Sequence, residues 1–221
     1  MIRHILFDLD DTLYPTSAGM MRDIDARMNE FMVTQVGFAP SEVVEWRKFY
    51  WQTYGTTLRG LYIEKHIDPQ AFLRFVHDVD PEKYLHLDVR LDAMLAQMAQ
   101  PKSIFTNAPA DYARRVLRAL GIEKHFAEIF DINFIEYASK PTPSAYDRVV
   151  ASLPVPANEC LMIDDAIRNL MPAKKLGMTT VWFDGNSATQ PQSSDSVDLT
   201  IKSIYDLADV ISPPSHRDTK L

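Results

Sequence analysis

Apolar residues follow two patterns along the chain, one that predicts short strands and one that predicts longer helices. Short apolar runs rich in β-forming residues predict buried strands at 2–7, 102–107, 129–132, 159–163, 178–183 and 199–201. Apolar residues spaced three and four apart predict helices at 17–36, 41–54, 61–66, 70–76, 89–98, 110–120, 143–153, 166–176 and 203–211. Strands that alternate with helices are typical of an α/β fold, so we expect a parallel, doubly wound sheet.

The stretch between Pro15 and Leu85 has no strand pattern, and we expect it to be an all-helical insert. Gly37 is predicted to end its first helix, and Ser41 is predicted to cap the second. Two glycines bracket residues 56–59, which predicts a loop or helix junction there. We therefore divide the chain into a core of residues 1–14 and 86–221 and an insert of residues 15–85. Residues 186–194 are expected to form a mobile polar loop, and residues 213–221 a disordered tail.

The first predicted strand runs directly into acidic residues. Asp8 and Asp10 are two positions apart, so in an extended chain both point the same way, roughly 6–7 Å apart. Two such carboxylates repel one another unless a cation lies between them, and Mg²⁺ prefers oxygen ligands of this kind. A plainer alternative is that Asp10 or Asp11 only caps a turn, because turns favour aspartate.

Polar residues also end two later strands. Thr106 and Asn107 follow an apolar run and precede a predicted helix, where backbone N–H groups bind anions well. Asp164 and Asp165 end another apolar run, and buried carboxylates are costly unless a cation or hydrogen-bond donors meet them. Either pair could instead serve only as a turn or as the cap of the next helix.

Lys140 lies on a loop just before a predicted helix. The proline after it disfavours a helix up to that point, and Pro143 suits the first turn of the helix that follows. A lysine on a loop is usually a solvated surface charge.

Composition narrows the classes of partner. The formal net charge is −7 and 46% of the residues are hydrophobic, as in a soluble globular protein without the basic face needed to bind nucleic acid polymers or anionic membranes. The single cysteine excludes a disulfide framework and favours a reducing compartment. No apolar run approaches the roughly 20 residues of a membrane span, so we expect a cytoplasmic protein. We expect it to be a monomer or a homodimer.

Four segments together carry a family resemblance: FDLDDTLYP at 7–15, the strand ending in Thr106, KPTPSAY at 140–146, and IDDAIRN at 163–169. In this order they resemble the four motifs of haloacid dehalogenase-type phosphohydrolases. The resemblance implies a Rossmann-like core with a C1-type helical cap, and hydrolysis of a small-molecule phosphomonoester through an aspartyl-phosphate.

The resemblance also implies a role for each motif residue. Asp8 is the nucleophile, Asp10 the general acid and base, and Lys140 the group that neutralises the phosphate. Thr106 and Asn107 are expected to bind the remaining phosphate oxygens. Asn169 lies where the family often places a supporting Asp or Asn. Mg²⁺ is the implied cofactor, held by Asp8, the Asp10 carbonyl and Asp165 as primary ligand, with Asp164 as its neighbour.

The substrate class is predicted from the insert. Residues 50–61, YWQTYGTTLRGL, combine aromatic faces, hydroxyls and an arginine that suit a base or a sugar. The alternative is a helix hairpin whose aromatics fill the insert's own core. The segment resembles the cap of the pyrimidine 5′-nucleotidase branch, which implies a nucleoside 5′-monophosphate substrate and contacts from Tyr54, Thr56 and Arg59.

Four other functions remain open. A broad sugar-phosphate or phosphoglycolate phosphatase would share the whole core, and a phosphomutase would use the same four motifs. A dehalogenase is disfavoured because Asp10 and the acidic fourth motif indicate a metal-dependent reaction. A non-catalytic binding module is disfavoured because Asp8, Lys140 and Asp165 are all present.

Overall fold

Six parallel strands form one sheet at the centre of the molecule. The computed structural model describes residues 1–185 and 195–211. The sheet has the order β3-β2-β1-β4-β5-β6, and every neighbouring pair is parallel, which confirms the predicted α/β class. The strands are β1 (His4–Phe7), β2 (Lys102–Phe105), β3 (Glu128–Phe130), β4 (Cys160–Asp164), β5 (Thr179–Phe183) and β6 (Leu199–Ile201).

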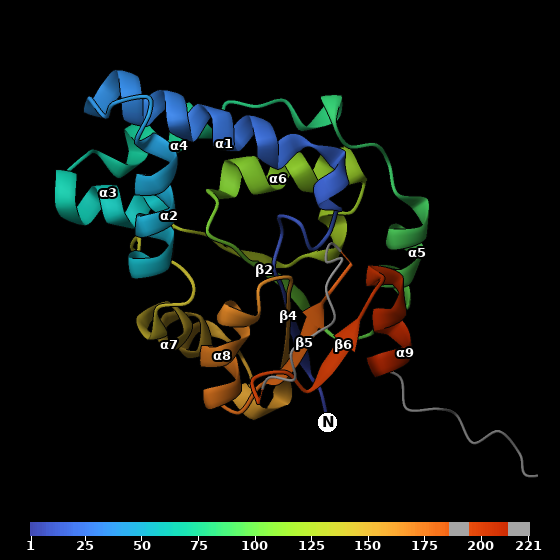
Figure 1. The fold of residues 1–221 in the computed structure, drawn as a ribbon. Helices are drawn as coiled ribbons and strands as arrows, with labels where there is room; N and C mark the ends of the chain where they lie inside the picture. The colour runs from blue at the N-terminus through green and yellow to red at the C-terminus, as the bar shows by residue number, and fades with distance from the viewer. Residues whose placement is uncertain (186–194, 212–221) are drawn as a thin grey trace, which may run out of the picture.

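Helices cover both faces of the sheet (Figure 1). On one side, α8 packs against β4 and β5, and α7 packs against α8. On the other side, α5 contacts α9, and α6 packs beside β3. Their bounds are α5 (Val89–Gln97), α6 (Ala110–Leu120), α7 (Pro143–Ser152), α8 (Ile167–Lys175) and α9 (Leu207–Ile211).

Between β1 and β2 the described chain forms helices and no strand, as predicted. The helices of the insert gather beyond the carboxyl ends of the strands (Figure 1). Gly37 adopts a φ of +88° after the helical turn at Met32–Val36, which confirms the predicted stop. The four main helices are α1 (Met20–Phe31), α2 (Val43–Tyr54), α3 (Thr57–Lys65) and α4 (Pro69–Val76).

Two predicted helix starts in the insert are wrong. Residues 39–42 close a turn in which the Glu42 amide donates to the Ala39 carbonyl, so α2 begins at Val43 and Ser41 does not cap it. The predicted helix junction lies at Gly55 and Thr56, but the Thr56 hydroxyl accepts from the Arg59 amide at 3.1 Å, so α3 begins at Thr57 and not at residue 61.

The third strand ends two residues earlier than predicted, and an aspartate follows its last residue. Asp131 follows β3, and its carboxylate accepts from the backbone amides of Ala110 at 2.9 Å and Phe134 at 2.8 Å. The side chain thereby ties the end of β3 to the start of α6 and to the turn that follows β3. The chain turns at this point toward the loop that carries Lys140.

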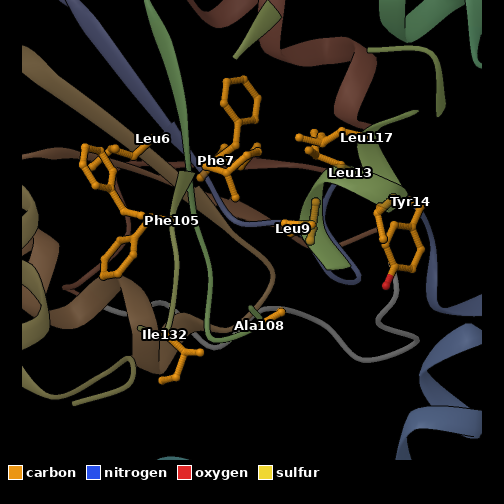
Figure 2. Packing of buried hydrophobic residues seen from close by; sticks show 14 of the residues in the cluster. Leu6, Phe7, Leu9, Leu13, Tyr14, Phe105, Ala108, Leu117 and Ile132 are labelled. Atoms are coloured by element: carbon orange, nitrogen blue, oxygen red, sulfur yellow. The ribbon is translucent and has the colours of Figure 1, made fainter. Parts of the chain in front are cut away.

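The core is continuous from the sheet into the turn after β1. Leu9 and Leu13 are 0% and 2% exposed and lie close to Phe7 (Figure 2). These apolar contacts hold the turn against the sheet while the aspartates between them remain available to a site. The predicted polar loop at 186–194 and the predicted tail at 213–221 lie outside the described residues. Within the described ranges, no helix combines the length and apolar character needed to cross a membrane.

Gly60 lets α3 approach α2 closely, and this contact can be tested. A Cβ at Gly60 would lie 2.3 Å from Cδ1 of the buried Tyr50 ring, so Gly60→Ala must displace that ring. Overpacking of this kind costs roughly 1–3 kcal/mol, more than the roughly 1 kcal/mol by which alanine favours a helix. We expect a lower free energy of unfolding in urea, whereas Gln52→Ala on the exposed face of α2 should change it little. A Gly60→Ala variant as stable as the wild type would show that the ring moves aside at no cost.

Candidate active site

The candidate site lies where the strand order reverses, between β1 and β4. Phe7 pairs with Ile163 in the parallel ladder, and the Asp8 amide donates to the Ile163 carbonyl at 2.9 Å. The next residues of the two strands, Asp8 and Asp164, therefore lie side by side at the carboxyl edge of the sheet. Ligand sites of doubly wound sheets form at this point.

A buried lysine bridges these two aspartates. The Lys140 ammonium lies 2.7 Å from Oδ1 of Asp8 and 2.7 Å from Oδ2 of Asp164. All three side chains are buried, and Lys140 is 1% exposed. Burial lowers the pKa of Lys140, but the carboxylates of Asp164 and Asp8 outweigh burial and leave that pKa raised. Lys140 is therefore a fixed positive charge rather than the solvated surface lysine of the plainer alternative.

Asn107 holds the backbone that carries Lys140. Its Oδ1 accepts from the Lys140 amide at 2.7 Å, and its Nδ2 donates to the Lys140 carbonyl at 3.2 Å. Three residues just before Lys140 have a positive φ, namely Glu136 at 50°, Tyr137 at 59° and Ser139 at 37°. This backbone conformation is costly for residues other than glycine. The surrounding contacts must therefore maintain this loop.

The insert supplies several of those contacts. Nη1 of Arg59 donates to the Tyr137 carbonyl at 3.1 Å, and Gln70 donates to the Tyr137 hydroxyl at 2.9 Å. Gly55, at a φ of +93°, packs so closely on the loop that a Cβ there would lie 3.1 Å from the Lys140 carbonyl oxygen. The insert thus contacts the loop that carries Lys140 directly.

The three predicted substrate contacts of the insert have partners within the protein. Thr56 caps α3, and Arg59 holds the Tyr137 carbonyl. The Tyr54 hydroxyl donates to Glu64 on α3 at 2.7 Å. Tyr54 also packs against the Tyr50 and Phe49 rings, at centroid distances of 6.1 and 6.4 Å, as in the alternative in which aromatics fill the insert core.

Three carboxylates provide a donor set that fits Mg²⁺. Oxygens of Asp8, Asp164 and Asp165 lie within 4.8 Å of one another. With all three ionised and Lys140 protonated, the group carries two negative charges in excess, which a divalent cation balances. Burial, followed by the charge of Asp8, raises the pKa of Asp165, as expected where carboxylates crowd together. Hard oxygen donors of this kind are the ligands that Mg²⁺ takes in proteins.

Asp164 and Asp165 have different surroundings. Asp164 is 0% exposed, and its carboxylate accepts from Lys140, from the Ala166 amide at 2.9 Å and from Asn169 Nδ2 at 3.0 Å. Asp165 is half-buried, and its amide donates to the Thr12 hydroxyl at 3.1 Å. Asp164 thus anchors Lys140 and Asn169, whereas Asp165 has the more accessible carboxylate.

The Asp10 side chain belongs to a separate hydrogen-bond group. Its Oδ1 accepts from the Tyr14 hydroxyl at 2.5 Å and from the Tyr112 hydroxyl at 2.9 Å. Burial raises the pKa of Asp10 to about 7, against the opposing effect of the Tyr14 hydrogen bond. A carboxyl group that titrates near neutral pH suits proton transfer in both directions.

Sequence analysis overlooked three residues of the site. Thr12 donates to Oδ2 of Asp8 at 3.2 Å, and both tyrosines reach Asp10. Thr12 and Tyr14 lie within the FDLDDTLYP segment, four residues after the aspartates they contact, which is a usable local signal. Tyr112 comes from α6 and has no such signal. Thr106 is buried at the end of β2, where its hydroxyl accepts from the Ala108 amide at 3.0 Å.

The doubly wound fold with an acidic group at its switch point is the arrangement of an α/β protein with a ligand site at the carboxyl ends of its strands. A model of the haloacid dehalogenase-like hydrolase family matches residues 2–177. The chain belongs to this family, and the predictions of the superfamily and of an enzyme of the hydrolase class are confirmed.

Relatives agree with the predicted phosphatase class. The chain is 28% identical over 188 residues to phosphate metabolism protein 8 of Saccharomyces cerevisiae; the match covers 78% of this chain but 58% of the yeast protein's length. It is 24% identical over 233 residues to the phosphoglycolate phosphatase of Yersinia pestis, with 100% of this chain and 97% of that protein covered. A magnesium-bound hydrolase of the same superfamily from Bacillus subtilis shares the fold, with a TM-score of 0.60 at 19% identity over 96% of this chain and 99% of that chain.

The different surroundings of the two neighbouring aspartates lead to a prediction about metal binding. Asp165→Asn should weaken Mg²⁺ binding about tenfold or more in isothermal titration calorimetry, because it removes an accessible ligand charge. Asp164→Asn should weaken Mg²⁺ binding less but lower the thermal unfolding midpoint, because Lys140 loses one of its two buried partners. The opposite order of Mg²⁺ affinities would exchange the roles of the two side chains.

Proposed function

We propose that this protein is a Mg²⁺-dependent phosphomonoester hydrolase that acts through an aspartyl-phosphate on Asp8. The observation that carries the proposal is the position of Asp8 at the switch point, held by Lys140 and Thr12 within a group of three carboxylates. A carboxylate there is oriented and electrostatically stabilised, and a phosphoryl group placed against it would meet the Lys140 charge.

The proposed reaction has two steps. An Asp8 oxygen attacks phosphorus, the bond from phosphorus to the ester oxygen breaks, and Asp10 gives its proton to the departing oxygen. A water molecule then attacks the phosphorus of the aspartyl-phosphate while Asp10 takes its proton. The bond between phosphorus and Asp8 breaks, which releases inorganic phosphate and restores both aspartates.

Other groups hold the phosphoryl oxygens in this proposal. Thr106, the backbone beside Asn107, and Lys140 are the candidates, and the Asn107 side chain keeps Lys140 in place. Asp8, Asp165 and the Asp10 carbonyl would hold Mg²⁺. Bound there, the ion supplies positive charge to the phosphoryl oxygens as negative charge shifts during transfer.

The narrower proposal is a nucleoside 5′-monophosphate substrate, as in pyrimidine 5′-nucleotidases. It rests on the resemblance of residues 54–61 and on the contact between this segment and the loop that carries Lys140. The second candidate is a phosphoglycolate or sugar-phosphate phosphatase. The alignment over the whole chain with the Yersinia pestis phosphoglycolate phosphatase favours that candidate.

The nucleophile can be tested by removing its charge. Asp8→Asn keeps the shape of the side chain but makes a poor nucleophile, so phosphate release should fall by at least about a thousandfold. Circular dichroism should show an unchanged fold. The matched control is Asp147→Asn, on the exposed face of α7, which should retain wild-type activity. A folded Asp8→Asn variant with wild-type phosphate release would rule out the aspartyl-phosphate on Asp8.

A substrate panel tests the narrower proposal. Stacking of a base on an aromatic ring is worth roughly 1–3 kcal/mol, so kcat/KM for UMP and CMP should exceed that for ribose 5-phosphate about tenfold or more. Tyr54→Ala should remove this preference. Tyr54→Phe, which keeps the ring but loses the bond to Glu64, should preserve it. A preference for phosphoglycolate that is unchanged in both variants would favour the second candidate.

A further inference from the structure

Two tyrosine hydroxyls meet the same oxygen of Asp10. Tyr14, on the turn after β1, and Tyr112, on α6, both donate to Oδ1, and their hydroxyl oxygens are 3.3 Å apart. Phenol and carboxylate oxygens thus form a compact triangle. It joins segments that are 98 residues apart in the sequence.

The core fixes both tyrosine rings. Tyr14 is 3% exposed and lies beside Leu13 on the same turn (Figure 2), and Tyr112 is 0% exposed. The Tyr112 ring lies 4.8 Å from the His77 ring, and His77 is held in turn by the Leu73 carbonyl at 3.0 Å. The positions of both hydroxyls are therefore set by packing. The Asp10 carboxyl group cannot rotate about its own axis without breaking two hydrogen bonds.

The two oxygens of Asp10 are consequently not equivalent. A carboxyl oxygen has two lone-pair positions, and in Asp10 both positions of Oδ1 accept a phenolic hydrogen. Oδ1 is therefore poorly placed to carry a proton of its own. The carboxyl proton is then carried by the other oxygen, Oδ2. A positioned acid with one defined proton-bearing atom is what general acid catalysis needs.

We infer that Tyr14 and Tyr112 are positioning residues that fix the Asp10 carboxyl group and assign its proton exchange to Oδ2. The inference rests on the proposed function and extends it. In the first step the bond from Oδ2 to hydrogen breaks as the hydrogen bonds to the departing ester oxygen. In the second step Oδ2 takes one proton from the attacking water. The tyrosines keep their own protons throughout.

A merely structural role for the tyrosines is the rival explanation, and leaving-group dependence separates the two. Phenyl phosphate and p-nitrophenyl phosphate have similar shapes, but phenolate needs a proton as it departs whereas p-nitrophenolate departs readily without one. Loss of a positioned acid therefore affects phenyl phosphate more. Loss of fold or of substrate binding affects both esters equally.

The experiment measures kcat/KM for both esters with the full-length Mg²⁺-loaded enzyme and its Tyr14→Phe and Tyr112→Phe variants. Each variant keeps the buried ring and removes one hydroxyl. We expect kcat/KM for phenyl phosphate to fall about tenfold or more, and that for p-nitrophenyl phosphate to fall less than about threefold. This quantity covers only the steps up to departure of the alcohol, so slow hydrolysis of the aspartyl-phosphate does not affect it.

Tyr205→Phe is the matched control, because its hydroxyl donates to Asp88 at 2.7 Å, outside the proposed site. It should change neither ester's kcat/KM. In an Asp10→Asn background, Tyr14→Phe should add no loss specific to phenyl phosphate, because the tyrosine acts only through Asp10.

Three results would overturn the inference. The first is an equal fall for both esters in the two tyrosine variants, and the second is a further loss specific to phenyl phosphate in the Asp10→Asn background. The third is a wild-type enzyme that with Mg²⁺ hydrolyses neither of these esters nor UMP, CMP, ribose 5-phosphate or phosphoglycolate. That result alone would also remove the proposed function, so the two failures are distinguishable.

Discussion

The buried ammonium of Lys140 between Asp8 and Asp164 is the contact on which the rest of the site depends. Two buried carboxylates at adjacent strand ends would repel one another strongly without the ammonium between them. Removal of one partner from such a buried ion group typically lowers the free energy of unfolding by several kcal/mol. Lys140 makes it possible for β1 and β4 to end in acids side by side. Together with Asp165 the group still carries negative charge in excess, which a divalent cation would balance.

The placement of Lys140 draws on both parts of the fold. Asn107 at the end of β2 holds its backbone from the core, while Arg59 and Gly55 contact the same loop from the insert. The positive φ angles before Lys140 would be unfavourable in an isolated chain, and these contacts hold them in place. The insert therefore has a structural role at the site in addition to any contact with substrate, because it supports the loop that carries Lys140.

Elements of regular structure were largely predictable because their patterns are local. The α/β class, the parallel sheet, the helical nature of the insert and the stop at Gly37 all follow from apolar periodicity and glycine chemistry. The errors lie at the ends of elements, where a turn or a side-chain contact sets the boundary. The Thr56 cap starts α3 earlier than the apolar pattern indicates, and β3 ends just before Asp131, whose carboxylate binds two amides.

The sequence by itself pointed to the candidate site residues, because Asp8, Asp164 and Asp165 lie at the ends of buried strands and Lys140 stands just before Pro141. Only the tertiary structure decided their pairings. The bond from Lys140 to Asp164 and the bond from Tyr112 to Asp10 join residues 24 and 102 positions apart, and no local pattern encodes such contacts. They arise because parallel strands bring their carboxyl ends to one edge, so that distant turns meet there.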